Sequence, residues 1–255
     1  MKTILLFNAV GILSLMLCVW LVSIRRSDVS IIDIVWGMGF VLVAWTSWAS
    51  RDAGERSLWI PVMTTVWGVR LSGYLARRNH GKPEDYRYAE MREKHGTAFR
   101  WISLFTVFWL QGLILFLVSL PLQFAQALQE DRVALLITGI VLFSVGLCFE
   151  TVGDWQLARF RRNPENKGRV LNTGLWRLTR HPNYFGDFCV WWGLGVLSLS
   201  CGAPVLILAS CLLMSILLLR ISGVPLLEKS LVSRRDGYAE YIRRTSAFFP
   251  WPPRK

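Results

Sequence analysis

The chain has 255 residues, of which 53% are hydrophobic and only 18% are charged, and its formal net charge is +12. A soluble domain of this length is usually more polar, so the composition predicts a membrane protein. The basic residues lie in short segments between apolar runs, which favours membrane topology over nucleic-acid binding as the origin of the charge. Five scattered cysteines without C-x-x-C spacing and three isolated histidines indicate neither a zinc site nor a disulfide framework.

The N-terminal segment begins Met-Lys-Thr and continues as an apolar run to Ser23. We expect a retained first span rather than a cleaved signal, because the run is long, Arg25 and Arg26 follow it, and no small-residue cleavage site is present. A membrane span needs about 20 apolar residues. Seven segments qualify, at about 3–23, 29–49, 58–76, 101–122, 133–153, 186–200 and 203–222. The sixth is short, and a turn is expected between Ser198 and Pro204.

Basic residues are distributed very unequally between the loops on the two sides of these spans. One set of segments, including 77–100, 154–185 and the tail from Arg220, carries 24 Lys and Arg, whereas the alternate set carries four. Because basic residues mark the cytoplasmic side, the N-terminus is expected outside and the C-terminus inside. The predicted fold class is therefore an all-α, multi-pass membrane bundle of about seven helices, forming one membrane domain.

Charged residues interrupt several spans. Asp33 lies in the second span and Arg70 in the third, while Glu150 and Asp154 are four residues apart near the inner end of the fifth. Charges at such depths are costly and usually face a partner or a water-filled cavity. One interpretation is a polar cavity open to the cytoplasm. The alternatives are that Asp33 simply pairs with Arg70, and that Glu150 and Asp154 reach the membrane interface.

The segment 172–187 is the densest polar stretch of the chain. Pro182 has no backbone N–H and cannot donate a hydrogen bond within a helix. Gly186 has no side chain and permits a close approach of another backbone. Several donors before a span can form an anion site at a helix N-terminus, although an ordinary helix cap is the simpler alternative. The tail then interleaves arginines with aromatic rings over 234–253. That pattern suits stacking on a base and equally suits an amphipathic helix on anionic headgroups.

Several motifs together resemble a known family. Arg180-His181-Pro182-Asn183-Tyr184-Phe185-Gly186-Asp187, Gly237-Tyr238-Ala239-Glu240-Tyr241 and the proline-containing tail resemble the C-terminal domain of the steroid 5α-reductase superfamily. Asp33-Ile34-Val35-Trp36-Gly37 and Glu84-Asp85-Tyr86-Arg87-Tyr88 are similar to features of its DUF1295 branch. The Arg-His-Pro-Asn-Tyr segment is also similar to one in sterol C14 and C7 reductases.

The resemblance implies an NADPH-dependent reductase of a carbon–carbon double bond in a steroid-like or other lipid. It implies a lipid-substrate half at 1–125 and a cofactor half at 133–255. The residues that it places at the cofactor are Asp154, Arg161, Arg169, Arg180, His181, Asn183, Tyr184, Asp187, Arg220, Tyr238 and Tyr241. For the substrate cavity it points to Asp33, Trp36, Trp67 and Arg70. Candidate proton donors are Asp33, Tyr184 and Tyr88, and no metal is expected.

The chain departs from the steroid 5α-reductases in its substrate half. Asp33 stands where those enzymes carry a Gln-Glu pair, and Trp67 is nearest to their carbonyl-polarising Tyr. One alternative is an S-adenosylmethionine-dependent methyltransferase of the isoprenylcysteine carboxyl methyltransferase type, although Leu227-Glu228 replaces the Glu-Glu pair of those enzymes. A second is a non-catalytic lipid-binding membrane protein. Membrane lipids but no nucleic acid are expected as partners, and the expected location is the bacterial inner membrane.

Overall fold

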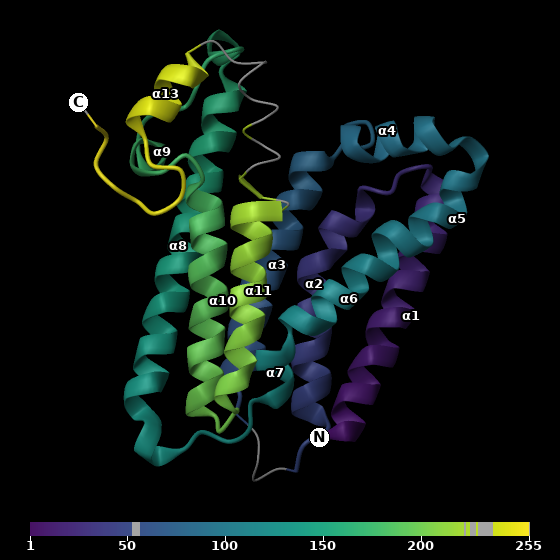
Figure 1. Cartoon of the computed structure of the whole chain (residues 1–255), viewed down its shortest axis with the longest axis vertical. Helices are drawn as coiled ribbons and strands as arrows, with labels where there is room; N and C mark the ends of the chain where they lie inside the picture. The colour runs from purple at the N-terminus through teal and green to yellow at the C-terminus, as the bar shows by residue number, and fades with distance from the viewer. Residues whose placement is uncertain (53–56, 222, 225–227, 229–236, 255) are drawn as a thin grey trace. The chain divides into compact units, whose positions relative to one another are not determined.

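The computed structural model describes residues 1–52, 57–221, 223–224, 228 and 237–254, so Leu227 and Ser222 of the predicted features lie outside the described residues. Helices and loops make up the described chain, in which no strand occurs (Figure 1). Four helical segments in it are long and apolar enough to cross a membrane: Lys2–Arg26, Ile31–Ala49, Tyr86–Val118 and Val133–Arg162. The all-helical class is as predicted, whereas seven spans and their orientation stay predictions.

The chain divides into two compact units. The first comprises Met1–Asp131 and Ser198–Ile207, and the second comprises Arg132–Leu197 and Leu208–Lys255. The longer helices of the first unit are α1 (Lys2–Arg26), α2 (Ile31–Ala49), α3 (Trp59–Asn79), α4 (Tyr86–His95), α5 (Phe99–Ser103), a π-helical turn η3 (Leu104–Trp109), α6 (Leu110–Val118) and α7 (Leu120–Phe124). Its short 3₁₀ turns include η2 (Gly96–Ala98) and η6 (Val205–Ile207).

The second unit contains the helices that carry the expected cofactor residues. They are α8 (Val133–Arg162), α9 (Leu175–Leu178), α10 (Pro182–Ser200), α11 (Leu208–Ile216), a π-helical turn η7 (Leu217–Ile221) and α13 (Tyr238–Arg244). The last three residues of α10 belong to the first unit. A 3₁₀ turn η5 (Pro164–Asn166) follows α8, and another, η4 (Glu130–Arg132), precedes it.

Glycine contacts bring the long helices of each unit unusually close. In the first unit, a Cβ on Gly37 of α2 would lie 2.7 Å from the Gly68 carbonyl oxygen of α3. In the second unit, a Cβ on Gly146 of α8 would lie 2.5 Å from the Gly186 carbonyl oxygen of α10. Such small-residue contacts let helix backbones approach in lipid, where apolar burial alone gives little driving force. The helices at each seam therefore touch through their backbones.

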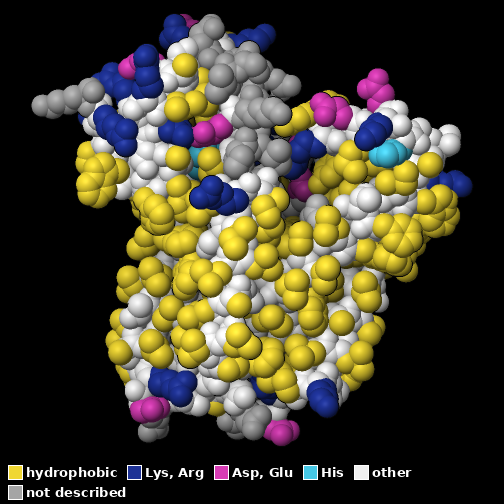
Figure 2. Space-filling model, in the orientation of Figure 1, with side chains coloured by type: hydrophobic (Ala, Val, Ile, Leu, Met, Phe, Trp, Pro, Cys, Tyr) yellow, Lys and Arg dark blue, Asp and Glu magenta, His cyan; other side chains and the backbone are white. Residues whose placement is uncertain are grey.

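The exposed sides of the helices are apolar. On α1, for example, Leu6, Phe7, Val10, Leu13 and Leu17 are all exposed. In Figure 2, hydrophobic side chains cover the helix flanks, and most Lys, Arg, Asp and Glu lie at helix ends. Large apolar exposure of this kind is unfavourable in water and suits a lipid environment.

Each predicted span coincides with a helical segment, with differences at the ends. Helix α8 extends past residue 153 to Arg162, and its last turn is too polar to belong to a span. The arginines of that turn interact favourably with the negative end of the helix dipole. The loop 77–100 contains the amphipathic helix α4, capped by the Asp85 side chain, which accepts a hydrogen bond from the Arg87 backbone N–H. Between α10 and η6 the chain turns at Gly202, where φ is +76°, within the predicted turn region.

Candidate functional sites in the two units

In the first unit, the loop before α2 holds the start of α4 in place. The Val29 backbone N–H donates to Glu84 Oε1 at 2.7 Å, and the Asp85 N–H donates to Ser30 Oγ at 2.7 Å. Arg92 donates from Nε and Nη2 to the same Glu84 carboxylate at 2.9 and 2.8 Å. These contacts fix α4 against the beginning of α2, close to Asp33.

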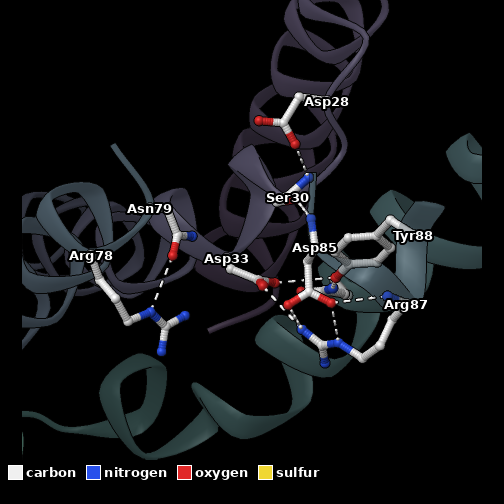
Figure 3. Close-up of polar contacts among 9 residues, drawn as sticks. Asp28, Ser30, Asp33, Arg78, Asn79, Asp85, Arg87 and Tyr88 are labelled. Carbon is white, nitrogen blue, oxygen red and sulfur yellow. Dashed lines mark hydrogen bonds and ion pairs between the residues drawn. The ribbon is translucent and has the colours of Figure 1, made fainter. Parts of the chain in front are cut away.

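The Tyr88 hydroxyl lies at the centre of the polar cluster that results. It donates to Asp33 Oδ1 at 3.1 Å and accepts from Gln111 Nε2 of α6 at 3.2 Å. Tyr88 is buried, and the Asp33 side chain is 21% exposed. Two of the three predicted proton donors, Asp33 and Tyr88, are therefore in direct contact (Figure 3). We call Asp33, Tyr88 and Gln111 the phenol cluster.

Arg87 supplies the positive charge beside the phenol cluster. Its Nη2 lies 3.3 Å from Asp33 Oδ2, and its Nε donates to Asp85 Oδ1 at 2.8 Å (Figure 3). Burial alone would raise the pKa of Asp85, but the hydrogen bonds and charge of Arg87 outweigh burial and lower it. The ion pair of Asp33 thus differs from the Arg70 pair weighed as an alternative from sequence, and Arg70 instead lies over the Tyr74 ring.

The tryptophans expected near the substrate pack deeper along α2 and α3. The rings of Trp36 and Phe40 pack edge to face, with their centroids 4.9 Å apart. The Phe40 ring packs in the same way on the fully buried Trp67, with a centroid distance of 5.7 Å. Trp67 therefore serves as a core residue between α2 and α3. Trp36 lies one helical turn beyond Asp33, with its buried indole N–H lacking a partner among the described residues.

In the second unit, Arg180 is buried and fully engaged with protein groups. Its Nε and Nη2 donate to Glu228 at 2.6 and 3.1 Å, and its Nη1 donates to the carbonyls of Ile242 and Thr245 at 3.1 and 2.6 Å. This guanidinium joins the segment before α10 to α13. Arg180 therefore holds these segments together, because its guanidinium hydrogen bonds go to protein groups.

His181 and Tyr184 lie beside this ion pair. His181 Nε2 is 3.1 Å from Glu228 Oε1, and its ring stacks on the Tyr184 ring at 5.4 Å. Burial alone would raise the pKa of Glu228, but hydrogen bonds and charges from His181 and Arg180 outweigh it and lower the pKa to about 2. Glu228 is thus ionised at neutral pH and compensates the positive charge of the buried segment.

The predicted acidic residues of α8 lie against the start of α10. Glu150 and Asp154 are both buried, and a Cβ on Gly186 would lie 2.7 Å from the Glu150 backbone nitrogen. Asn183 and Asp187 are four residues apart in the first turns of α10, so they share a helix face on either side of this contact. The predicted role of these groups at a cofactor stays a prediction.

The remaining predicted residues of this unit differ in exposure. Arg161, Arg169 and Arg220 are exposed, the first in the last turn of α8 and the last in η7. Tyr238 and Tyr241 are buried in α13 with ring centroids 5.8 Å apart. The Tyr241 hydroxyl donates to the Trp176 carbonyl. Burial, and then the charge of Glu228, raises the pKa of Tyr238 to about 12, so its phenol stays neutral.

Three contributors to these sites were not among the predicted site residues: Gln111, Arg87 and Glu228. A single Gln in the apolar run of α6 is a signal for Gln111, because a lone amide in lipid needs a partner. Glu228 was visible as a charge after the last span, but its partners lie far away in the sequence. No group of three or more His, Cys, Asp or Glu that could hold a metal ion occurs among the described residues.

Comparison with known proteins gives one family and one short match. A sequence model of the family described as a protein of unknown function, DUF1295, matches residues 19–245. A protein from Ustilaginoidea virens with the name "Probable O-methyltransferase ustE" is 45% identical over 56 residues, which is 22% of this chain and 19% of that protein. The matched segment thus spans less than a fifth of that relative. No solved structure gives a significant match.

Proposed function

The chain belongs to the DUF1295 family, whose description specifies no activity, and we propose that it is a membrane-embedded, NADPH-dependent reductase of a polarised carbon–carbon double bond in a lipid. The observation that carries the proposal is the phenol cluster. In it, a buried tyrosine hydroxyl contacts a carboxylate and an amide at the end of an apolar bundle. Reduction of such a bond requires a proton at a defined atom, and this arrangement can deliver one.

The phenol cluster would act as the acid. The hydroxyl of Tyr88 rotates about its C–O bond at little cost, so the Tyr88 proton that Asp33 accepts in a hydrogen bond can turn toward a substrate carbon or oxygen. Gln111 donates to the Tyr88 oxygen and stabilises negative charge that develops there. Asp33 has its carboxylate partly exposed, which gives water a route for returning a proton to Tyr88. Arg87 keeps the Asp33 carboxylate oriented.

NADPH would supply the hydride, and the second unit carries residues that suit it. A dinucleotide with a 2′-phosphate needs several cations, and this unit has exposed arginines at 161, 169 and 220. Asn183 and Asp187 add an amide and a carboxylate on one face of α10. Arg180, His181 and Glu228 would hold the wall of this site in shape through their mutual contacts.

The first experiment measures the cofactor. Purified protein in detergent is titrated with NADPH and, separately, with S-adenosylmethionine, and thermal unfolding reports binding. We expect NADPH to stabilise the protein against thermal unfolding. The substitutions Asn183→Ala and Asp187→Ala should each lower the affinity for NADPH about tenfold or more. Unchanged NADPH binding in both variants would refute the cofactor assignment.

The second experiment tests the acid with a matched pair of variants. Tyr88→Phe removes the buried hydroxyl, and Tyr86→Phe removes an exposed one from the same helix. With lipid extract as substrate, loss of NADPH fluorescence is expected to slow about 100-fold in Tyr88→Phe and to change less than about twofold in Tyr86→Phe. NADPH binding should be equal in both. Equal turnover in both variants would exclude Tyr88 as the proton donor.

A methyltransferase is the second candidate, favoured by the local identity to ustE. In that case Asp33 would act as a base that removes a proton from the substrate oxygen, and S-adenosylmethionine rather than NADPH would stabilise the protein. The same titration therefore separates the two activities. Stabilisation by neither cofactor would support the non-catalytic lipid-binding alternative.

A further inference from the structure

The C-terminal tail forms a pocket whose lining residues, apart from Arg180, have no part in the proposed reaction. The pocket has a volume of about 340 Å³, and its lining includes Arg180, Arg243, Arg244, Ser246, Trp251 and Arg254. All of these residues belong to the second unit. We call it the arginine pocket.

Backbone pairing builds this pocket. The Arg254 N–H donates to the Arg244 carbonyl at 2.8 Å, and Arg244 Nε donates to the Arg254 carbonyl at 3.4 Å. The tail is also joined to the segment before α10, because the Trp251 N–H donates to the Leu178 carbonyl and the Arg180 N–H to the Ser246 carbonyl, both at 2.9 Å. The fold thus holds Arg244 and Arg254 next to each other.

The charges of the arginine pocket are only partly balanced. Glu228 neutralises Arg180, and Glu240 pairs with Arg243. Within the described part of the chain, neither Arg244 nor Arg254 forms an ion pair with a carboxylate. Arg244 and Arg254 both line the pocket, and positive charges that share one pocket repel each other unless an anion is bound with them. The pocket is therefore complementary to an anion.

Exposed aromatic rings place the pocket at the level of the membrane surface. Phe249 packs 6.1 Å from Phe185 and 5.9 Å from Phe188, so the tail lies beside the first turns of α10 (Figure 1). Phe249 is 58% exposed and Trp251 is 69% exposed. Exposed aromatic rings at the end of an apolar helix are typical of the boundary between hydrocarbon and headgroups.

Helix α8 marks the same boundary independently. Its early residues Val133, Ile137 and Val141 are exposed and apolar, whereas its last turn is basic. The change occurs near Trp155, which is 57% exposed and carries Arg159 over its ring at 5.5 Å. A Cβ on Gly153, two residues earlier, would lie 3.2 Å from Pro182 Cγ at the start of α10. The tail and Trp155 are thus level with one another.

We propose that the arginine pocket binds the phosphate of an anionic phospholipid headgroup, with Arg244 and Arg254 as its ligands and Trp251 beside the upper acyl region. Guanidinium groups bind phosphate oxygens in a forked geometry, and a basic pocket at this depth attracts anionic lipid. The pocket shares no lining residue with the phenol cluster, and its proposed ligands Arg244 and Arg254 have no part in the proposed reaction, although Arg180 also supports the proposed nucleotide site.

The test measures lipid binding to the full chain by native mass spectrometry and by thermal shift in detergent. Short-chain phosphatidylglycerol is compared with phosphatidylcholine, which has the same chains and no net charge. In the unaltered protein, phosphatidylglycerol should bind about tenfold more tightly or better. The double variant Arg244→Gln, Arg254→Gln should lose that preference.

Arg25→Gln with Arg26→Gln is the matched control, because it removes two exposed positive charges from the end of α1. It should retain the lipid preference. The single variant Arg254→Gln, at an exposed tail position, carries the test if the double variant does not fold. Equal binding of both lipids, or equal losses in the two double variants, would overturn the proposal.

Two soluble ligands test the source of the phosphate. Glycerol phosphate should bind far more weakly than phosphatidylglycerol, because the acyl chains add apolar contact with Trp251. Equal affinity would mean a site for free phosphate and would overturn the lipid assignment. Displacement of phosphatidylglycerol by NADPH in a one-to-one manner would show that the pocket belongs to the nucleotide, which would also overturn it.

Discussion

Replacement of Glu228 by glutamine should destabilise the protein in a manner that depends on pH. The carboxylate accepts two hydrogen bonds from buried Arg180 and lies 3.1 Å from His181 Nε2. A pKa lowered from 4.5 to about 2 corresponds to roughly 3 kcal/mol of stabilisation at neutral pH. Solvent screening of the partly exposed side chain reduces the expected loss to about 1–2 kcal/mol.

The sign of the pH dependence follows from the direction of the shift. Because the folded-state pKa of Glu228 is lowered, its stabilisation is complete above pH 4.5 and disappears as the pH falls toward 2. At pH 7, Glu228→Gln should lower the unfolding temperature by roughly 3–6 °C. The difference between the two proteins should shrink steadily below pH 4.5.

The assay is tryptophan fluorescence during thermal unfolding in detergent, at a series of pH values. Glu240→Gln is the control, since it makes the same chemical change in an exposed pair with Arg243. A loss of less than about 0.5 kcal/mol is expected there. If both variants lose equal stability, or if the effect of Glu228→Gln does not change with pH, the ion pair does not hold this segment.

Two further substitutions test the packing. Gly146→Ala should destabilise the second unit by about 2 kcal/mol or more, because its Cβ would meet the Gly186 carbonyl, whereas Gly73→Ala faces open space and should be neutral. Thermal unfolding of both variants measures this difference, and equal stability would contradict the close contact. Asn8→Ala should lower the free energy of unfolding by about 2–3 kcal/mol, because buried Ser47 and Gln123 each lose the hydrogen bond that Asn8 donates. Exposed Asn172→Ala is its control in a chemical denaturation, and equal midpoints would contradict the network.

The sequence was sufficient for elements that depend on local composition. Apolar runs of about 20 residues predicted every long helix, and Gly202 lies at the turn expected between 198 and 204. The length of α8 was not predictable in the same way. Its last nine residues are too polar for a span, yet they continue the helix because no proline or glycine stops it before Pro164.

The sites divide along the same line. Asp33 and Tyr88 were identifiable as candidates, because a carboxylate in a span and a tyrosine in a polar loop are conspicuous. Their contact depends on how the loop before α2 binds Glu84 and Asp85, and periodicity does not reveal such a tertiary contact. The pairing of Arg180 with Glu228 was hidden for the same reason, since 48 residues separate them. The assignments to cofactor and substrate remain predictions that the titrations above address.

The attachment of Arg180 to the tail has a consequence for biosynthesis. Its guanidinium is satisfied by Ile242 and Thr245, which leave the ribosome 62 and 65 residues after it. Until those residues are synthesised, the charge of Arg180, two residues before the start of α10, has to remain hydrated. Insertion of α10 and closure of its polar end are therefore separate events in time. A nascent chain stalled between them should expose this segment to proteases that the finished protein resists.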